Sequence, residues 1–125
     1  MKTLKIIHSD DNTFNNNVTE LLMGRKIIEV KKHSDQEGEL ILDNGIILYV
    51  IGNEGCGGCG NGWYNLTELN SCDNIITNVT CENDEEQYNI FVFAENTKIN
   101  AVQFDGYDNG WYGTGYQLRV MVKEK

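Results

Sequence analysis

The sequence of 125 residues contains no proline, only two arginines and only two histidines, and its longest apolar run covers residues 46–51. Without proline, its turns must depend on glycine, asparagine and aspartate. The apolar run is far shorter than the roughly 20 residues that a membrane-spanning helix needs. Residues 1–8 give way to polar residues before a signal-peptide core can form. We therefore expect a cytosolic protein with no membrane segment.

Positive charge is also scarce, since the net charge is −9 and the isoelectric point is about 4.5. General binding to nucleic acid depends on lysines and arginines that displace counterions from phosphates, so DNA and RNA are not expected partners. A small anion needs only one or two well-placed cations. Lysine outnumbers arginine and can provide the solubility of the surface. Arg25 and Arg119 are therefore candidates for sites that need a planar, bidentate donor. The alternative is that both are ordinary surface or half-buried arginines.

The spacing of apolar residues predicts a mainly β (α+β) fold, an antiparallel β-rich single domain over residues 1–125 with one short N-terminal helix. The helix is predicted at residues 16–23, with Thr13 or an asparagine as N-cap and Gly24 as its stop. Asn44-Gly45 between two apolar runs predicts a two-residue hairpin turn. Six or seven strands are expected, at residues 26–32, 39–43, 46–51, 74–81, 87–94, 98–104 and 116–123.

Two of these strands carry candidate functional side chains, because alternate residues of a strand point to opposite faces. In the last strand, Arg119 projects away from the aliphatic face. In the strand at residues 87–94, Phe91 and Phe93 share one face. If the two strands are neighbours, the two rings and the arginine line one concave surface. The alternative is a two-sided core in which the phenylalanines only pack.

Glycine is concentrated in two loops, at residues 52–62 and 106–115, and each loop contains the tetrapeptide Asn-Gly-Trp-Tyr. The two copies, at residues 61–64 and 109–112, include both tryptophans. Glycine backbone that takes positive φ angles can hold such rings around a pocket, so Trp111 is a candidate ligand contact. The alternative is that the rings anchor loops at the ends of a β core.

The four cysteines leave several roles open. Cys56 and Cys59 form a C-x-x-C motif with glycines inside it, which is typical of a zinc knuckle. Cys72 and Cys81 have eight residues between them, a spacing that suits no common knuckle. A zinc site built from all four residues, a redox dithiol and a disulfide are alternatives. We expect reduced thiols, and neither a metal nor another cofactor.

Motifs for catalysis are not recognisable in the sequence. His8 and His33 have no carboxylate or nucleophile at a spacing that is typical of a triad. The glycine-rich loop at residues 52–62 has no Gly-Lys-Ser/Thr ending and opens no helix, so it predicts neither a P-loop nor a dinucleotide-binding turn. Asp105 and Asp108 could act as acid and base, although short acidic turns are common. We expect a protein that is not an enzyme.

Three short motifs follow one another along the chain: Leu-Leu-Met-Gly-Arg-Lys-Ile at residues 21–27, Leu-Ile-Leu-Asp-Asn-Gly at residues 40–45, and Gly-Trp-Tyr-Gly-Thr-Gly-Tyr at residues 110–116. Together with the Cys/Gly loop between them, this succession of motifs extends over most of the chain. In this succession the sequence resembles small phage and prophage proteins of the first-described Thoeris anti-defence family. The resemblance implies a non-enzymatic sponge in the cytoplasm of the infected bacterial host. Such proteins bind cyclic ADP-ribose isomers made by bacterial TIR enzymes, and some also bind cyclic oligonucleotides.

A cyclic ADP-ribose isomer carries a pyrophosphate, an adenine and ribose hydroxyls. Stacking contributes about 1 to 3 kcal/mol per base, and a charge-assisted hydrogen bond about 1.5 to 3 kcal/mol. Two of each give roughly 5 to 12 kcal/mol, whereas nanomolar binding needs about 12, so we expect a homo-oligomer whose subunits enclose the ligand together. The candidate ligand-binding residues are Arg25 and Arg119 for the phosphates, Phe91, Phe93 and Trp111 for the base, and Asn100, Gln103 and Asp105 for the hydroxyls.

Two alternatives from other classes stay open. One is a phage accessory module that binds a host protein through its tryptophan loops, in which case nucleotides should not shift its melting temperature. The other is a small structural zinc module, which should contain about one metal ion per chain. Its ligands would be Cys56, Cys59, Cys72 and Cys81.

Overall fold

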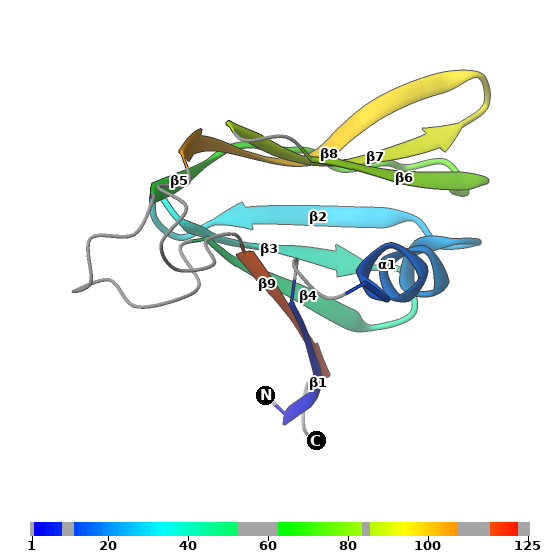
Figure 1. Ribbon diagram of the computed structural model, residues 1–125. Coiled ribbons are helices and arrows are strands. Elements are labelled where there is room, and N and C mark those ends of the chain that lie inside the picture. Colours follow the sequence, from blue (N-terminus) through cyan, green and yellow to red (C-terminus); the bar gives the residue numbers. More distant parts are fainter. Residues whose placement is uncertain (1, 9–11, 53–62, 84–85, 108–115, 123–125) are drawn as a thin grey trace.

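The computed structural model describes residues 2–8, 12–52, 63–83, 86–107 and 116–122. They form two antiparallel β-sheets and one helix, α1 (Phe14–Leu22), as Figure 1 shows. Sheet A has the strand order β1-β9-β4-β3-β2, and sheet B has the order β5-β8-β7-β6. The strands are β1 (Lys2–His8), β2 (Ile27–Lys32), β3 (Glu37–Leu42), β4 (Ile46–Gly52), β5 (Trp63–Leu69), β6 (Asn78–Asn83), β7 (Gln87–Ala94), β8 (Thr97–Tyr107) and β9 (Tyr116–Val122). The predicted mainly β fold with one short helix is confirmed.

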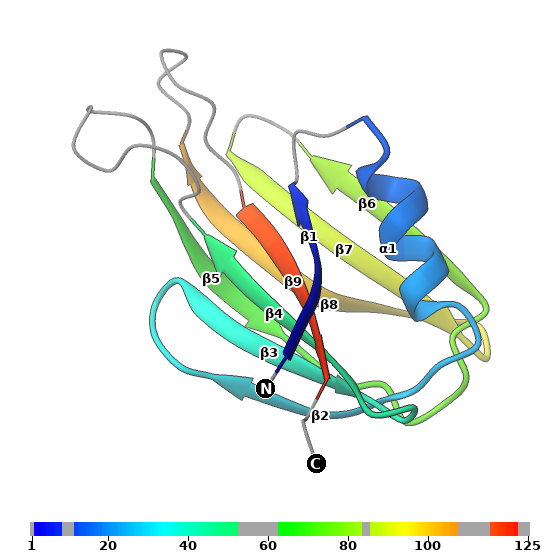
Figure 2. The same ribbon diagram turned by 90° about the horizontal axis from the view of Figure 1, so that it is seen from below.

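The two sheets form layers that meet along one side and separate toward the other (Figure 1). On the side where they meet, β5 of sheet B contacts β2, β3 and β4 of sheet A. On the open side lie the edge strands β1 and β6, and α1 contacts both of them there (Figure 2). The helix therefore closes a gap that two diverging sheets leave between them.

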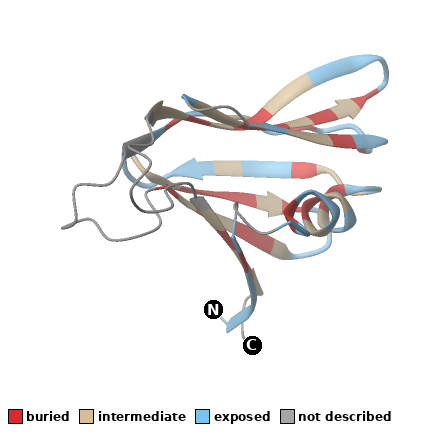
Figure 3. Ribbon diagram, in the orientation of Figure 1, coloured by how far each residue is buried: buried red, intermediate tan, exposed pale blue. Residues whose placement is uncertain are grey.

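One apolar core lies between the layers, and strand alternation produces it. Buried and more exposed residues follow one another along most strands, as the bands in Figure 3 show. Burial of these apolar side chains is the main stabilising term of such a fold, at roughly 25 cal/mol per Å². The core includes Leu40, Leu42, Leu48, Val50, Leu118 and Val120 from sheet A, and Leu66, Ile90, Val92, Ala94, Ala101, Val102 and Phe104 from sheet B.

The helix buries one face, formed by Phe14, Val18 and Leu22, at a spacing of four residues. It begins two residues before the predicted start. Thr13 does occupy the N-cap position, but its hydroxyl accepts a hydrogen bond from the Asn17 side chain and does not cap the backbone. Within the described residues, no helix has the length and apolar character to cross a lipid bilayer.

The hairpin between β3 and β4 differs slightly from its prediction. β3 ends at Leu42 and β4 begins at Ile46, so the loop has three residues where two were expected. Gly45 has a φ angle of +88° and donates its N–H to the Leu42 carbonyl at 3.1 Å. A positive-φ glycine at the third loop position is typical of three-residue hairpins. The Asn-Gly pair therefore located the turn correctly and gave its length wrongly.

The structure has more strands than the six or seven that were predicted. β1 was missed because it is an edge strand whose Leu4 and Ile6 are exposed, so it lacks the usual alternation of buried and polar residues. β5 was missed because the register shifts between Leu66 and Glu68, which interrupts its alternation. The strand predicted at residues 74–81 begins only at residue 78.

A close approach between the sheets generates the first prediction. A Cβ atom at Gly38 would lie 2.8 Å from Leu69 Cδ2, 2.9 Å from Leu66 Cδ2 and 3.0 Å from the Lys31 carbonyl oxygen. We predict that Gly38→Ala lowers the free energy of unfolding by about 1–3 kcal/mol, because the added methyl group overpacks this contact. Urea denaturation of both proteins measures the difference.

A double-mutant cycle provides the control. Leu69→Ala removes one of the two opposing side chains, so it should cost less stability in the Gly38→Ala protein than in the wild type. Simple addition of the two costs would contradict the proposed clash.

Candidate functional site

A hollow of about 330 Å³ lies on the outer face of sheet A, the face that is turned away from sheet B. Three adjacent strands, β3, β4 and β9, form its lining. We call it the Arg119 hollow. Its lining residues are Glu37, Tyr49, Ile51, Gln117, Arg119 and Met121.

The core holds the arginine in this position. Leu118 and Val120 are buried between the sheets, so Arg119 between them must point outward. In the register of β4 and β9, Tyr49 lies directly opposite Arg119. Side chains opposite each other on one sheet face have Cβ atoms about 4.5–5.5 Å apart. The predicted outward direction of Arg119 is thus confirmed, and its neighbour Tyr49 is a residue that sequence reasoning missed.

Arg119 has no anionic partner among the described residues. None of the ion pairs in the described part of the chain involves it, and its Nε atom is buried without a hydrogen-bond partner there. A buried donor without a partner costs about 1–3 kcal/mol. The guanidinium group therefore retains donors that an anion entering the hollow could use.

Two carboxylates occupy the same face, and each contacts a side chain other than Arg119. Glu37 accepts a hydrogen bond from the Tyr49 hydroxyl, with 3.0 Å between the oxygens. Glu39 is 6% exposed, and its Oε2 atom lies 3.4 Å from His33 Nε2. The His33 ring also stacks on Tyr49, with 5.7 Å between ring centroids. These contacts hold both carboxylates without using the guanidinium group.

The phenol at the centre of this arrangement is kept in its neutral form. Burial raises the pKa of Tyr49 above its usual 10.0, the hydrogen bond to Glu37 raises it further, and so do the charges of Glu37 and Glu39. The positive charge of Arg119 acts in the opposite direction. At neutral pH Tyr49 is therefore a hydrogen-bond donor that fixes Glu37 at the rim of the hollow.

A second cluster lies on the outer face of sheet B, where β7 and β8 pair. It contains five of the predicted ligand-binding residues and we call it the amide–aromatic face. Its alternation is as predicted, since the intervening residues of β7 are buried in the core. The members of this face are Phe91, Phe93, Asn100, Gln103 and Asp105.

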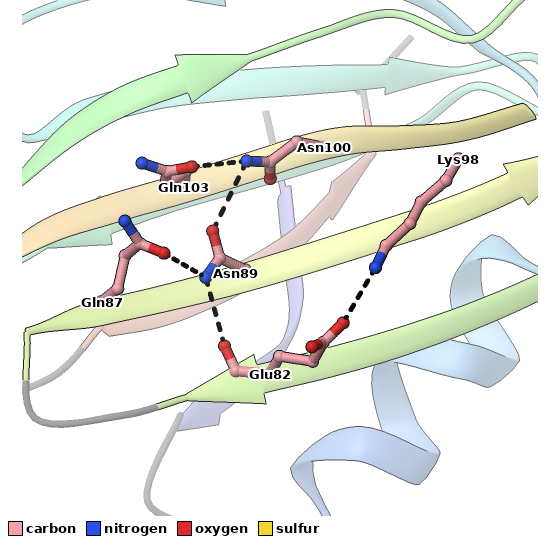
Figure 4. A network of polar contacts seen from close by, with 6 residues as sticks. All are labelled: Glu82, Gln87, Asn89, Lys98, Asn100 and Gln103. Atoms are coloured by element: carbon pink, nitrogen blue, oxygen red, sulfur yellow. Dashed lines mark hydrogen bonds and ion pairs between the residues drawn. The ribbon is translucent and has the colours of Figure 1, made fainter.

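The polar side chains of the amide–aromatic face bond mainly to one another (Figure 4). Asn100 Nδ2 donates to Gln103 Oε1 at 2.5 Å and to Asn89 Oδ1 at 3.4 Å. Asn89 in turn donates to Gln87 Oε1 at 2.9 Å, and Gln103 donates to Asp105 at 2.9 and 3.0 Å. The N–H donors of these amides are therefore used within the network.

A cation that the sequence analysis did not consider, Lys98, lies over the aromatic pair. Its Nζ atom is 4.1 Å from the centroid of Phe91 and 5.8 Å from that of Phe93. Such cation–π contacts are worth about 0.5–1 kcal/mol at exposed sites. On either side of Phe91, Thr80 Oγ1 and Asn100 Oδ1 are buried without a hydrogen-bond partner among the described residues.

The phenylalanine strand and the arginine strand are not neighbours, so the condition for one concave surface shared by Phe91, Phe93 and Arg119 is not met within one chain. β7 pairs with β6 and β8, whereas β9 pairs with β1 and β4 of the other sheet. Within one chain, Phe91 and Arg119 therefore lie on opposite outer faces. Alternation predicts which residues share a face of one strand, but it does not predict which strands pair.

The remaining predicted ligand residues do not join either cluster in the described part of the chain. Arg25 lies between α1 and β2, where its side chain is 39% exposed and its Nη1 atom is 3.8 Å from a carboxylate oxygen of Asp43. It does not line the Arg119 hollow. Trp111 lies outside the described residues, as do both copies of the Asn-Gly-Trp sequence except for Trp63, which begins β5.

The cysteines that the structure describes are buried or half-buried in the core region. Cys72 is buried, and its thiol donates to the Asn74 carbonyl at 3.3 Å. Burial raises the pKa of Cys81 to about 12, which keeps this thiol protonated at neutral pH. Cys56 and Cys59 lie outside the described residues. In the part of the chain that is described, no three His, Cys, Asp or Glu side chains are grouped as a metal site.

The raised pKa of Tyr49 generates a prediction on alkaline stability. Because its folded-state pKa exceeds its unfolded value, its contribution to stability is fully present below pH 10 and is lost as the pH rises through the folded-state pKa. We predict that Tyr49→Phe, which cannot ionise, loses less stability than the wild type between about pH 9 and about pH 11. Melting temperatures of both proteins across this pH range measure the difference in their loss of stability.

Glu37→Gln is the matched control, because it keeps the phenol and removes the neighbouring charge. Its loss of stability should fall between those of the wild type and Tyr49→Phe. The same pH dependence in all three proteins would show that Tyr49 has no such role.

Comparison with known proteins identifies the family and no closer relative. No curated protein and no solved structure is significantly similar to the chain. The model of the family described as Domain of unknown function (DUF7448) matches residues 20–118, from within α1 to the middle of β9. Since this match covers well over half of the sequence, the chain belongs to the DUF7448 family.

Proposed function

We propose that the protein is a phage-encoded, non-enzymatic sponge for a cyclic nucleotide immune signal. The signal would be a cyclic ADP-ribose isomer made by bacterial TIR enzymes, and cyclic oligonucleotides are the second ligand class. Sequestration in the cytoplasm of the infected host would block its defence. The observation that supports this function best is the guanidinium group of Arg119, which forms no ion pair among the described residues and lines a hollow of an otherwise acidic protein.

In this proposal Arg119 binds the phosphates. A guanidinium group presents a planar fork that matches two oxygens of a phosphate, and such charge-assisted hydrogen bonds are among the strongest in proteins. Because no described carboxylate pairs with Arg119, a phosphate does not have to displace an existing ion pair. The position of Arg119 in the middle of β9 directs its side chain to the outer face of sheet A.

The other walls of the hollow suit the uncharged part of a nucleotide. Tyr49 contributes a flat ring, and Ile51 and Met121 contribute apolar surface. Stacking of a base on an aromatic ring contributes about 1–3 kcal/mol. The volume of about 330 Å³ is near the lower end of the range of ligand sites, roughly 300–1,000 Å³. One chain therefore covers only part of a ligand with two ribose rings.

Because one chain cannot enclose the whole ligand, the proposal includes a homo-oligomer. The amide–aromatic face and the Arg119 hollow lie on opposite sides of one chain, so a single ligand can contact both only at a boundary between subunits. There, Phe91 would supply a second aromatic surface and Lys98 a second cation, provided that Lys98 leaves the ring it covers and its ion pair with Glu82. Shared enclosure also excludes water, which strengthens each polar contact.

The first prediction of this function concerns the two arginines. We predict that Arg119→Ala weakens binding of cyclic ADP-ribose isomers by about 10- to 150-fold, the equivalent of a charge-assisted hydrogen bond. Arg25→Ala removes the same side chain from a site paired with Asp43, outside the hollow, and should change affinity less than about threefold. Isothermal titration calorimetry on the three proteins measures both effects.

Equal affinity of Arg119→Ala and the wild type would remove the Arg119 hollow from the proposal. Lost binding in Arg25→Ala alone would place the site at the end of α1 instead.

The second prediction distinguishes a sponge from an enzyme. The protein is mixed with the product of a TIR enzyme until the signal can no longer activate its effector, and is then denatured by heat. A sponge releases the ligand intact, because binding does not change covalent bonds, so signalling activity and the chromatographic mass should both return. A ligand of altered mass would show that the protein is an enzyme.

A further inference from the structure

The Arg119 hollow contains a negative charge as well as a positive one. Glu37 of β3 and Arg119 of β9 line it together, with β4 between their strands. Opposite charges in one hollow usually pair, but no ion pair forms between these two residues. The Tyr49 hydroxyl instead holds the Glu37 carboxylate at 3.0 Å. The hollow therefore presents separate donor and acceptor ends.

The Glu37 end of the hollow can accept further hydrogen bonds. A carboxylate has two oxygens that accept hydrogen bonds at several positions, and Tyr49 uses one oxygen, Oε2. Glu37 can thus accept further bonds from hydroxyl or N–H groups of a ligand. It cannot donate, and its charge opposes a phosphate that is placed directly beside it.

These two ends constrain how a nucleotide can bind. The phosphates must lie at the Arg119 end, and an uncharged part that donates hydrogen bonds must lie at the Glu37 end. In a nucleotide, the hydroxyls of a ribose are such donors, and they are separated from the phosphate by a few bonds only. Carboxylates bind ribose hydroxyls in this way in dinucleotide-binding folds.

We propose that Glu37 is a specificity-determining residue, which selects nucleotides with a free ribose hydroxyl near the phosphate and rejects those with a phosphate on that hydroxyl. This inference rests on the proposed function, because it assumes that a nucleotide occupies the Arg119 hollow. Glu37 acts by direct contact with the ligand, and Tyr49 acts through Glu37 as a positioning residue.

The test compares cyclic ADP-ribose with cyclic ADP-ribose 2′-phosphate by calorimetry. The wild-type protein should prefer the first ligand by about tenfold or more, since like charges in contact are strongly unfavourable. Glu37→Gln should reduce this preference to less than about threefold, because an amide can donate to the added phosphate. An unchanged preference in Glu37→Gln would overturn the inference.

Glu29→Gln is the matched control for charge. Glu29 is exposed on β2, at the edge of sheet A and outside the hollow, and its substitution changes the net charge by the same amount. It should leave the preference unchanged. An equal reduction in both variants would mean that overall charge sets the preference, which would also overturn the direct role of Glu37.

A measurement on the wild type alone covers the case in which Glu37→Gln does not fold. The 2′-deoxy form of cyclic ADP-ribose lacks the donor that Glu37 accepts, so it should bind at least about threefold more weakly. Equal binding of the two forms would overturn the inference while leaving the Arg119 result intact. If the wild type binds none of these ligands, the role of Glu37 is overturned, whereas the release assay with the product of a TIR enzyme tests the proposed function separately.

Discussion

Burial of alternate residues between two sheets is the constraint on which the rest of the structure depends. Leu118 and Val120 can remain in the core only if Arg119 points outward, and Leu48 and Val50 impose the same condition on Tyr49. A shift of β9 by one residue would exchange its core face with its outer face. The core therefore fixes which side chains of β4 and β9 face the Arg119 hollow, and sites built on strands are more precise than sites on loops.

The same physics explains how much could be predicted from the sequence. The fold class, the helix and the direction of Arg119 depend on local periodicity, which the sequence contains in full. The hollow depends also on which strands pair, and nothing within β4 or β9 specifies that Tyr49 lies opposite Arg119. For that reason Tyr49 and Glu37 were missed, and the sequence left open whether Phe91 and Arg119 share a surface. Strand β1 was missed because its apolar residues face solvent.

The two outer faces differ in what they can offer a ligand. On the amide–aromatic face, Asn100 and Gln103 already donate to neighbouring side chains, and Lys98 already covers Phe91. A ligand that binds there must replace existing contacts, so only the difference in strength contributes to affinity. In the Arg119 hollow the donors of the guanidinium group have no described partner to lose. In the proposed function we therefore place the phosphates in the hollow, and the amide–aromatic face of a second subunit would enclose the rest of the ligand.

An anion site on a chain with a net charge of −9 needs a physical explanation. Charges in solution are screened over about 8 Å at physiological ionic strength, so distant carboxylates affect a ligand in the hollow much less than adjacent ones do. The adjacent carboxylates, Glu37 and Glu39, contact Tyr49 and His33 instead, and neither forms an ion pair with Arg119. A long polyanion would extend from the hollow across the acidic surface and be repelled there. A small cyclic ligand would not extend so far, and the acidic surface therefore favours small nucleotides over nucleic acids without any contact to either.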